Sequence, residues 1–504
     1  MPHQICSRLV IATLLVTIPA ATSSELFAEL RAGAAKVDIA DPAAGKPHGD
    51  IYARALVIGD ERTTLVLVAV DAVAIGGIGS IRDEYLGAVR ERMSKELGLD
   101  PDKLLVNASH CHAKVAPDVA ERTFAAIKQA YERRVPVRIG TGVGREERIM
   151  ENRRMTLKNG REVDVRHAYS LAPDEEIADI GPVDPDIGVV RIDRLDGRPL
   201  ATLFQFAVHP IQGVPGGKNT SDLSGFAAQL LEDGLGHGAV ALFFQGCGGD
   251  INPIGYKAVD APRDAESLGH KLGHSTLVAL RATELKDDSR VAFARKVLPL
   301  PRADLAEKIA ETEAARDRLV DSLGGTSLNL KTFLPLAVKY KLSPEFPLAP
   351  SHRYLREQAR MADDLTYLDA ENRRNMEQYI RNIHTMEELT RVKTNLALLR
   401  MHQKQNVDSG SRTVDVELTA IRLGEFVLTT FPGELTVRIG LGIKSRSPHP
   451  RTFVSGYTNG YIYYAPTAEQ LKNVGGAQED SDCILAPEWQ GLYDEAADAL
   501  VKGI

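Results

Sequence analysis

The sequence predicts an α/β protein with mixed sheets and flanking helices, and two patterns support this prediction. Short apolar runs rich in β-branched residues end in polar clusters, as Thr64 to Val70 does at Asp71, and such runs are typical of buried strands with a functional edge. The runs Leu203 to Val208 and Val240 to Phe244 repeat this pattern. Charged amphipathic segments such as residues 80–97 lie between the runs and favour helices. Polar side chains that follow these strands are therefore the first candidates for a site.

The composition is that of a soluble globular protein. The chain has 504 residues, of which 43% are hydrophobic and 26% charged, and its net charge is −7. These values exclude a disordered or collagen-like chain. The mild acidity argues against binding through bulk positive charge, so no nucleic-acid partner is expected.

Residues 1–23 are expected to be a secretory signal peptide. Arg8 is followed by the apolar run Leu9 to Ala21, which ends in the small residues 21–23. The run is too short to span a hydrocarbon core of about 30 Å comfortably, so we expect no stable transmembrane anchor. A buried N-terminal helix is the alternative interpretation. The signal predicts a secreted or periplasmic protein.

Residues 24–504 are expected to form one large domain with a helical insertion at about 302–405. Within the insertion, apolar residues recur at helical spacings among many charges, and a proline-rich break lies at Pro344 to Pro350. A coiled-coil arm for oligomerisation is an alternative, although heptads are not sustained, so the sequence predicts no oligomeric state. After the insertion, alternating runs on either side of Gly424 predict a β-hairpin.

Three histidines follow predicted strands. His110 and His112 come after the apolar run 104–108, and His209 ends another such run. Residues i and i+2 of an extended chain share a face, so the first two imidazoles could enter one site, and imidazoles are common metal ligands. A polar loop with hydrogen-bonded histidines is the alternative for the pair, and a structural role is the alternative for His209.

Two polar loops accompany these histidines. Asp222 precedes a helix-like segment, where it could orient a ligating histidine or bind a substrate hydroxyl, and it could also cap the helix. The segment Gln245 to Pro253 is rich in glycine, which lets backbone N–H groups approach a ligand or an oxyanion. It lacks the lysine and the glycine spacing of a P-loop, and a tight turn is its alternative.

A carboxylate and a tyrosine cluster follow the hairpin. Glu434 ends the hairpin and opens an apparent helix, where the helix dipole favours a carboxylate whatever its function. Four tyrosines lie between Tyr457 and Tyr464. Such a cluster usually forms the wall of an amphipathic strand, and a phenol aimed into a site is the alternative.

The cysteines exclude a disulfide framework. Removal of the signal would leave Cys111, Cys247 and Cys483, so at most one intramolecular disulfide is expected. Cys111 and Cys247 fall in predicted site loops. They could face each other, one could add a soft metal ligand, or both could be small buried thiols.

The order of the motifs resembles that of the neutral/alkaline ceramidases, which are secreted zinc amidohydrolases that cleave the N-acyl bond of ceramide. The motifs are S-H-x-H at 109–112, A-V-H at 207–209, S-D-x-x-G at 221–225, G-D-x-x-P at 249–253, P-G-E at 432–434 and Y-x-x-Y at 461–464. Asp71, the Asn152-Arg153 pair and the segments 37–39 and 48–55 also resemble this family. The resemblance covers roughly residues 30–300 and 410–480.

The resemblance implies one Zn²⁺ per chain, held by His110, His209, Glu434 and Tyr464. Two imidazoles, a carboxylate and a phenol suit Zn²⁺ with one open position for water. The implied reaction is attack of zinc-activated water on the amide carbonyl, with His112 handling the proton for the leaving amine. Arg153 would meet the substrate, and Asp222 would support a ligand or face the substrate. Tyr464, Arg153 or a backbone N–H of the glycine-rich turn would stabilise the oxyanion.

The chain departs from that family in two places. Asn252 stands where the ceramidases have a serine that is held essential at the reaction centre, and an amide cannot act as a hydroxyl nucleophile. A covalent step at this position is therefore excluded, and Asn252 is expected to act there as a hydrogen-bond donor. The chain ends 40 residues after Tyr464, so we expect no C-terminal immunoglobulin-like β-sandwich domain of the kind the family carries.

Three functional hypotheses follow from the sequence. The first is a secreted zinc-dependent amidohydrolase whose substrate is a ceramide-like lipid. The second keeps the metal and the fold but changes the substrate to a carbohydrate or another polar amide or ester. The third is a non-catalytic binding homologue, because a shared fold does not guarantee chemistry.

Overall fold

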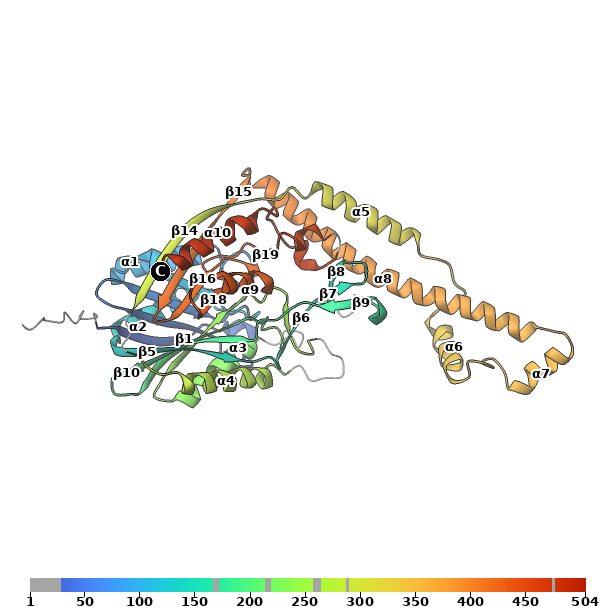
Figure 1. The fold of residues 1–504 in the computed structure, drawn as a ribbon, viewed down its shortest axis with the longest axis horizontal. Coiled ribbons are helices and arrows are strands. Elements are labelled where there is room, and N and C mark those ends of the chain that lie inside the picture. Colours follow the sequence, from blue (N-terminus) through green and yellow to red (C-terminus); the bar gives the residue numbers. More distant parts are fainter. Residues whose placement is uncertain (1–28, 166–171, 214–218, 257–263, 287–289, 474–475) are drawn as a thin grey trace, which may run out of the picture.

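The structure is a computed structural model that describes residues 29–165, 172–213, 219–256, 264–286, 290–473 and 476–504. The signal peptide expected at residues 1–23 lies outside the described residues. The predicted α/β class is confirmed, because mixed sheets are flanked by helices (Figure 1).

The first sheet has eight strands in the order β12-β11-β10-β5-β1-β2-β3-β4. The two pairs at its edges, β11 with β12 and β3 with β4, are parallel, and the other pairs are antiparallel. Its strands are β1 (Arg31–Asp38), β2 (Tyr52–Gly59), β3 (Thr64–Val70), β4 (Leu104–Ala108), β5 (Val135–Arg145), β10 (Asp186–Arg194), β11 (Pro199–Phe206) and β12 (Val240–Gln245).

A second sheet packs on the first, and helices cover both outer faces (Figure 1). The strand order of this sheet is β14-β15-β16-β18, and the predicted hairpin is present between β15 and β16, with Gly424 at a φ of 60°. The strands are β14 (Val291–Pro301), β15 (Thr413–Leu423), β16 (Phe426–Thr430) and β18 (Thr452–Ser455). The covering helices are α1 (Tyr85–Leu97), α2 (Val119–Glu132), α3 (Asp222–Leu235), α4 (Ala265–Ala282), α9 (Val437–Arg446) and α10 (Trp489–Lys502).

These four layers explain why β3 reads as an uninterrupted apolar run. Val66, Val68 and Val70 pack against the helices α1 and α2, whereas Leu65 and Leu67 pack against the second sheet. Because successive side chains of a strand point to opposite faces, a strand between two packed layers needs apolar residues at every position. Polar side chains can therefore be expected only in the loops that follow the carboxyl ends of such strands.

Short strands shape the loops at this edge. They form the pairs β13 with β6 and β17 with β19, and a three-stranded sheet in the order β8-β7-β9. Their bounds are β6 (Met150–Asn152), β7 (Arg154–Leu157), β8 (Glu162–Asp164), β9 (Ile177–Ile180), β13 (Ile251–Pro253), β17 (Glu434–Leu435) and β19 (Tyr464–Ala465).

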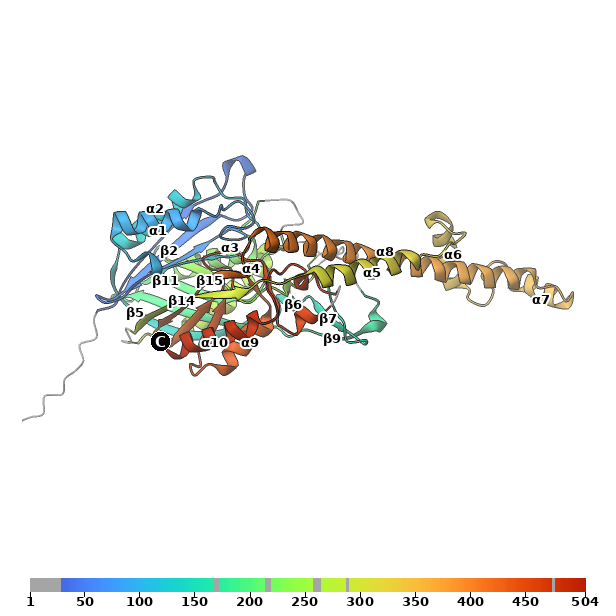
Figure 2. The ribbon, with the colours of Figure 1, turned by 90° about the horizontal axis from the view of Figure 1, so that it is seen from above.

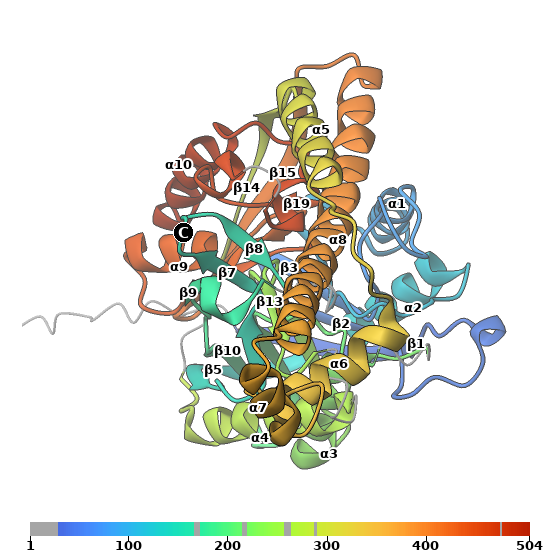
Figure 3. The ribbon, with the colours of Figure 1, turned by 90° about the vertical axis from the view of Figure 1, so that its right-hand side faces the viewer.

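Between β14 and β15 the chain forms a helical arm that projects far beyond the body (Figures 1 and 2). The arm consists of α5 (Ala306–Asp321), α6 (Leu330–Leu342), α7 (Ser351–Ala359) and α8 (Asp364–Asp408). Figure 3 looks along it, with α6 and α7 at the end nearest the viewer. The proline-rich segment predicted as a break separates α6 from α7. None of the helices in the described part of the chain has the length and apolar character that crossing a membrane requires.

Candidate metal centre

Three buried side chains from separate segments meet at the edge of the sheets. They are His110, which follows β4, His209, which follows β11, and Glu434 on β17, and each is 2% exposed. One ligand atom from each residue lies within 4.8 Å of the others. Glu434 Oε2 is 3.1 Å from Nε2 of His209 and 3.5 Å from Nε2 of His110. These three residues could hold a metal ion.

Backbone carbonyls fix both imidazole rings. Nδ1 of His110 lies 2.6 Å from the carbonyl oxygen of Val73, and Nδ1 of His209 contacts that of Gly248. A carbonyl only accepts, so each Nδ1 carries the proton and each Nε2 presents its lone pair to the centre. Burial lowers the pKa of His110 to about 4, so this imidazole is neutral at pH 7.

Glu434 is held as a carboxylate. Burial opposes its ionisation, but the two imidazoles and the hydroxyl of Tyr461 hold the pKa of Glu434 well below its usual range. Tyr461 donates to Oε1 at 2.5 Å, and Tyr457 donates to Oε2 at 3.1 Å. The centre therefore combines one carboxylate with two imidazoles, which is a donor set that Zn²⁺ prefers.

The loops reach this geometry through unusual backbone conformations. His110 has a φ of 64°, Tyr457 of 53° and Tyr463 of 68°. This left-handed region is costly for residues with a side chain, and non-glycine residues held there concentrate at functional sites. His110 and His112 were predicted to lie on an extended segment, and the left-handed backbone at His110 shows that this prediction was wrong. The two rings nevertheless lie 5.2 Å apart, with His112 exposed.

Two local expectations for this region were also wrong. Glu434 does not open a helix, because it lies in β17 and α9 begins only at Val437. The tyrosine cluster is a loop instead of an amphipathic strand, and only Tyr464 and Ala465 pair as β19. The alternative interpretation holds here, since the phenols of Tyr457 and Tyr461 point at Glu434.

Tyr464 and Arg153 extend the centre. The Tyr464 hydroxyl lies 3.5 Å from Nε2 of His209, and Nη2 of Arg153 donates to that hydroxyl at 3.1 Å. Nη1 of Arg153 donates to Oδ1 of Asn252 at 3.3 Å, so Asn252 accepts in this contact. All three side chains are buried. The structure thus places a phenol, a guanidinium and an amide beside the three possible ligands.

Sequence reasoning missed Glu479, which pairs with Arg153. Its Oε1 accepts from Nε of Arg153 at 2.6 Å, and Oε2 lies 3.4 Å from Nη1 of Arg154. Glu479 is fully buried, so these arginines offset the cost of its charge. The run Glu479 to Asp482 is acidic, but the pattern alone does not name a partner 326 residues away.

Asp222 is buried at the start of α3. Its carboxylate oxygens accept backbone N–H groups from Gln212, Gly213 and Leu223 at 2.7–3.2 Å. Burial raises the pKa of Asp222 to about 6. In this structure the carboxylate organises the loop that follows His209.

The cysteines lie apart from the metal group. Cys111, Cys247 and Cys483 are free and buried, and burial raises the pKa of each thiol. Cys111 packs in the core under α1 and α2, whereas Cys247 packs in the core under α9 and α10. Within the described residues the possible metal group contains no cysteine, which favours the interpretation as buried thiols.

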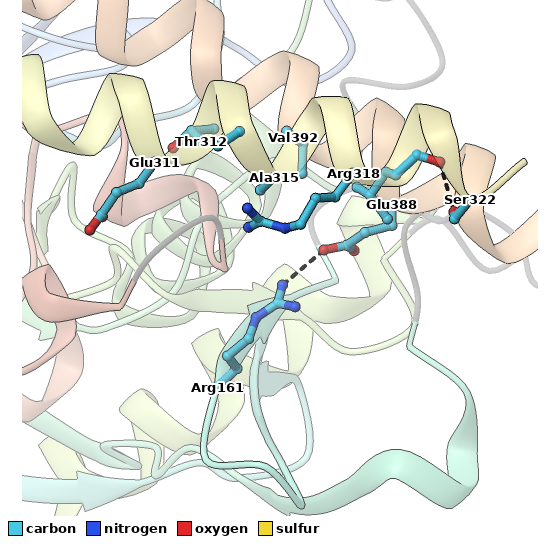
Figure 4. A pocket seen from close by; sticks show the side chains of 10 residues that line it. Arg161, Glu311, Thr312, Ala315, Arg318, Ser322, Glu388 and Val392 are labelled. Carbon is cyan, nitrogen blue, oxygen red and sulfur yellow. Dashed lines mark hydrogen bonds and ion pairs between the residues drawn. The ribbon is translucent and has the colours of Figure 1, made fainter.

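A groove of about 640 Å³ lies at the base of the arm, between α5 and α8 (Figure 4). Arg161, from the turn between β7 and β8, reaches Glu388 of α8 across it at 2.8 Å. Its lining includes none of the predicted site residues. The groove therefore belongs to the attachment of the arm.

The fold and the centre together define the class: an α/β sandwich with a buried His-His-Glu group that could hold a metal ion. No protein-family model and no curated protein sequence matches the chain. Among solved structures, a neutral ceramidase from Pseudomonas aeruginosa is similar, with a TM-score of 0.58 and 17% identity over 95% of this chain and 75% of that chain. A ceramidase complexed with C2 gives 0.57 and 16% over 94% and 75%. The chain thus has the fold of neutral ceramidases.

Proposed function

We propose that the protein is a zinc-dependent amidohydrolase that cleaves the N-acyl bond of a ceramide-like lipid. One observation carries the proposal: the two imidazole Nε2 atoms and the carboxylate of His110, His209 and Glu434 converge within 4.8 Å on a ceramidase fold. The export signal expected at residues 1–23 would direct this activity outside the cytoplasm.

The donor set fits one Zn²⁺ per chain. In each imidazole, Nδ1 donates its proton to a backbone carbonyl, so Nε2 is the nitrogen that can bind a metal. Glu434 supplies a negative charge. The Tyr464 hydroxyl, 3.5 Å from His209 Nε2, is the proposed fourth ligand. When bound, Zn²⁺ supplies Lewis-acid polarisation of the amide carbonyl and activation of water at neutral pH.

The surrounding side chains suit the charges that amide cleavage develops. Arg153 is fixed by Glu479, so its guanidinium presents donors toward Tyr464 without reorganising. These donors are placed to stabilise an oxyanion. His112 is exposed and its ring centroid lies 5.2 Å from that of His110, which supports its assignment as the group that protonates the leaving amine.

Asn252 gives the site a different chemistry from that of a serine at the same position. Its side-chain oxygen accepts from Arg153, so its amide nitrogen remains as the donor. An amide forms no acyl intermediate, and the proposed cleavage is therefore a direct hydrolysis. Asn252 would bind the substrate and not attack it.

Metal content and hydrolysis test this proposal together. Wild type should contain about one zinc per chain and hydrolyse a short-chain fluorescent ceramide in preference to a panel of glycosides and esters. His110→Ala and Glu434→Ala should lose both the zinc and the hydrolysis. Full activity after exhaustive chelation would refute the metal mechanism, and turnover of a glycoside or an ester in place of the ceramide would refute the substrate class.

A further inference from the structure

Helix α6, which lies in the outer part of the arm (Figure 1), exposes a continuous apolar stripe. Every fourth residue on one face is apolar and more than half exposed, and Leu342 is 80% exposed. The stripe consists of Leu330, Leu334, Val338 and Leu342. Residues four apart lie on one face of a helix, so these side chains form a single surface.

The opposite face of α6 is the one that holds it to the arm. Phe333 stacks on Tyr379 of α8 with ring centroids 4.6 Å apart, and the Tyr340 hydroxyl donates to Asp369 of α8 at 2.9 Å. The stripe is therefore not the packing face of the helix. Farther out, Leu355 of α7 and Met361, which follows α7, are also exposed, and Met361 is 97% exposed.

The same tip carries an excess of positive charge in an acidic chain. Residues 330–364, which include the start of α8, contain six basic and four acidic residues, whereas the whole chain has a net charge of −7. The basic residues are Lys331, Lys339, Lys341, Arg353, Arg356 and Arg360. All six are exposed, and none forms an ion pair with any residue that the structure describes.

The tip also stands clear of the body (Figures 1 and 2). Helix α8 begins at Asp364 at the tip and passes His402 at the base. At 1.5 Å per residue, these two residues lie about 57 Å apart along the helix axis. At the base, the ring of His402 lies 4.5 Å from that of Tyr463, next to the metal centre. One helix therefore joins the protruding tip to the loop that carries Tyr464.

We propose that this tip, residues 330–361, docks on the surface of an anionic lipid bilayer. Apolar side chains on an exposed helix face can enter the boundary between headgroups and acyl chains. The lysines and arginines of the same segment can bind anionic headgroups. Tip-to-tip pairing of two copies is disfavoured because it would bring two sets of unpaired positive charges together. This inference concerns binding alone and does not depend on the proposed reaction.

Vesicle flotation of the full chain tests the proposal without any substrate. Wild type should float with phosphatidylcholine vesicles that contain about 30% phosphatidylglycerol, and much less with phosphatidylcholine alone. Raising the salt concentration should weaken the binding, because exposed charges are screened.

Two sets of tip variants separate the apolar from the charged contribution. Leu334→Gln/Val338→Gln/Leu342→Gln should weaken vesicle binding at least about tenfold. Lys331→Gln/Lys339→Gln/Lys341→Gln should weaken it about 100-fold, since each basic residue near an anionic surface contributes a factor of about five. Matched controls on the body should bind like wild type: Val278→Gln, at an exposed position of α4, and Lys128→Gln/Lys158→Gln/Lys271→Gln.

Three results would overturn the proposal. They are the absence of binding to anionic vesicles, equal binding to neutral vesicles, and unchanged binding of both tip variants. Sedimentation provides a further check: a dimer of wild type that the tip variants abolish would assign the stripe to a second copy of the chain. Hydrolysis of a water-soluble short-chain amide by the same variants should match that of wild type, so failed docking is distinguishable from a failed reaction.

Discussion

Glu434→Gln isolates the charge at the proposed zinc centre, because the amide keeps the shape of the side chain. Structural zinc sites bind with about 10–16 kcal/mol, so each of four ligands carries roughly 3 kcal/mol. At 1.4 kcal/mol per tenfold, loss of one ligand corresponds to an affinity about 100-fold lower. The loss should fall on Glu434 in particular, because it supplies the only carboxylate among the four proposed ligands.

The assay is a zinc titration against a competing chelator, with thermal unfolding as a second readout. Zinc at 100 times its dissociation constant should stabilise wild type by about 2.7 kcal/mol, and the same concentration should stabilise the variant far less. Without metal, the variant should be about as stable as wild type, because removal of a buried charge offsets the weaker contacts with Tyr457 and Tyr461.

The matched control is Glu232→Gln on α3. Glu232 is also buried and charged, but it pairs with Arg54 and Lys36. This control should lose stability and keep its zinc affinity. If Glu434→Gln holds zinc against the chelator as strongly as wild type does, the assignment of Glu434 as a ligand is refuted.

Three further predictions concern the residues around the centre. Arg153→Met should cost about 3–5 kcal/mol in urea unfolding, and Arg153→Met/Glu479→Gln should cost less than the sum of its single changes, because the two charges are paired in the core. Burial raises the pKa of Asp222 from 3.8 to about 6, so the folded protein retains this proton to higher pH than the unfolded chain. The stability that this proton contributes to the fold is fully present below about pH 4 and is lost as pH rises through about 6. Between these limits the free energy of unfolding of wild type should fall by about 3 kcal/mol relative to that of Asp222→Asn. Equal pH profiles of the two proteins would contradict this prediction. Asn252→Ser should raise turnover of a short-chain ceramide if the substrate is a lipid amide, and an unchanged rate would argue for a different substrate.

A strand can be predicted from the sequence where its burial in the fold requires a regular pattern of apolar residues. The run Thr64 to Val70 is apolar at every position because both of its faces are covered, and Gly424 marks a turn that requires a positive φ. No residue pattern in the sequence predicts the direction in which the arm leaves the body. Its helices can be predicted from their periodicity, but the angle at which α8 leaves the body depends on contacts such as His402 with Asp482.

For the candidate site, the sequence identifies the side chains that end strands and misses those that support them. His110, His209 and Glu434 stand at the ends of predicted strands or hairpins, where chemistry is expected. The hydroxyl donors Tyr457 and Tyr461 were expected to line a strand, because four close tyrosines suit an amphipathic pattern. Their positions depend on a loop with left-handed residues, which no periodic pattern records.

The support of Glu434 bears on how the centre is assembled. A buried carboxylate is costly unless hydrogen bonds satisfy it, and two tyrosine hydroxyls meet that need here. The imidazoles are likewise oriented by backbone carbonyls. The strained backbone at His110, Tyr457 and Tyr463 is therefore stabilised by the surrounding layers. Contacts within the chain thus fix all three side chains of the possible metal group.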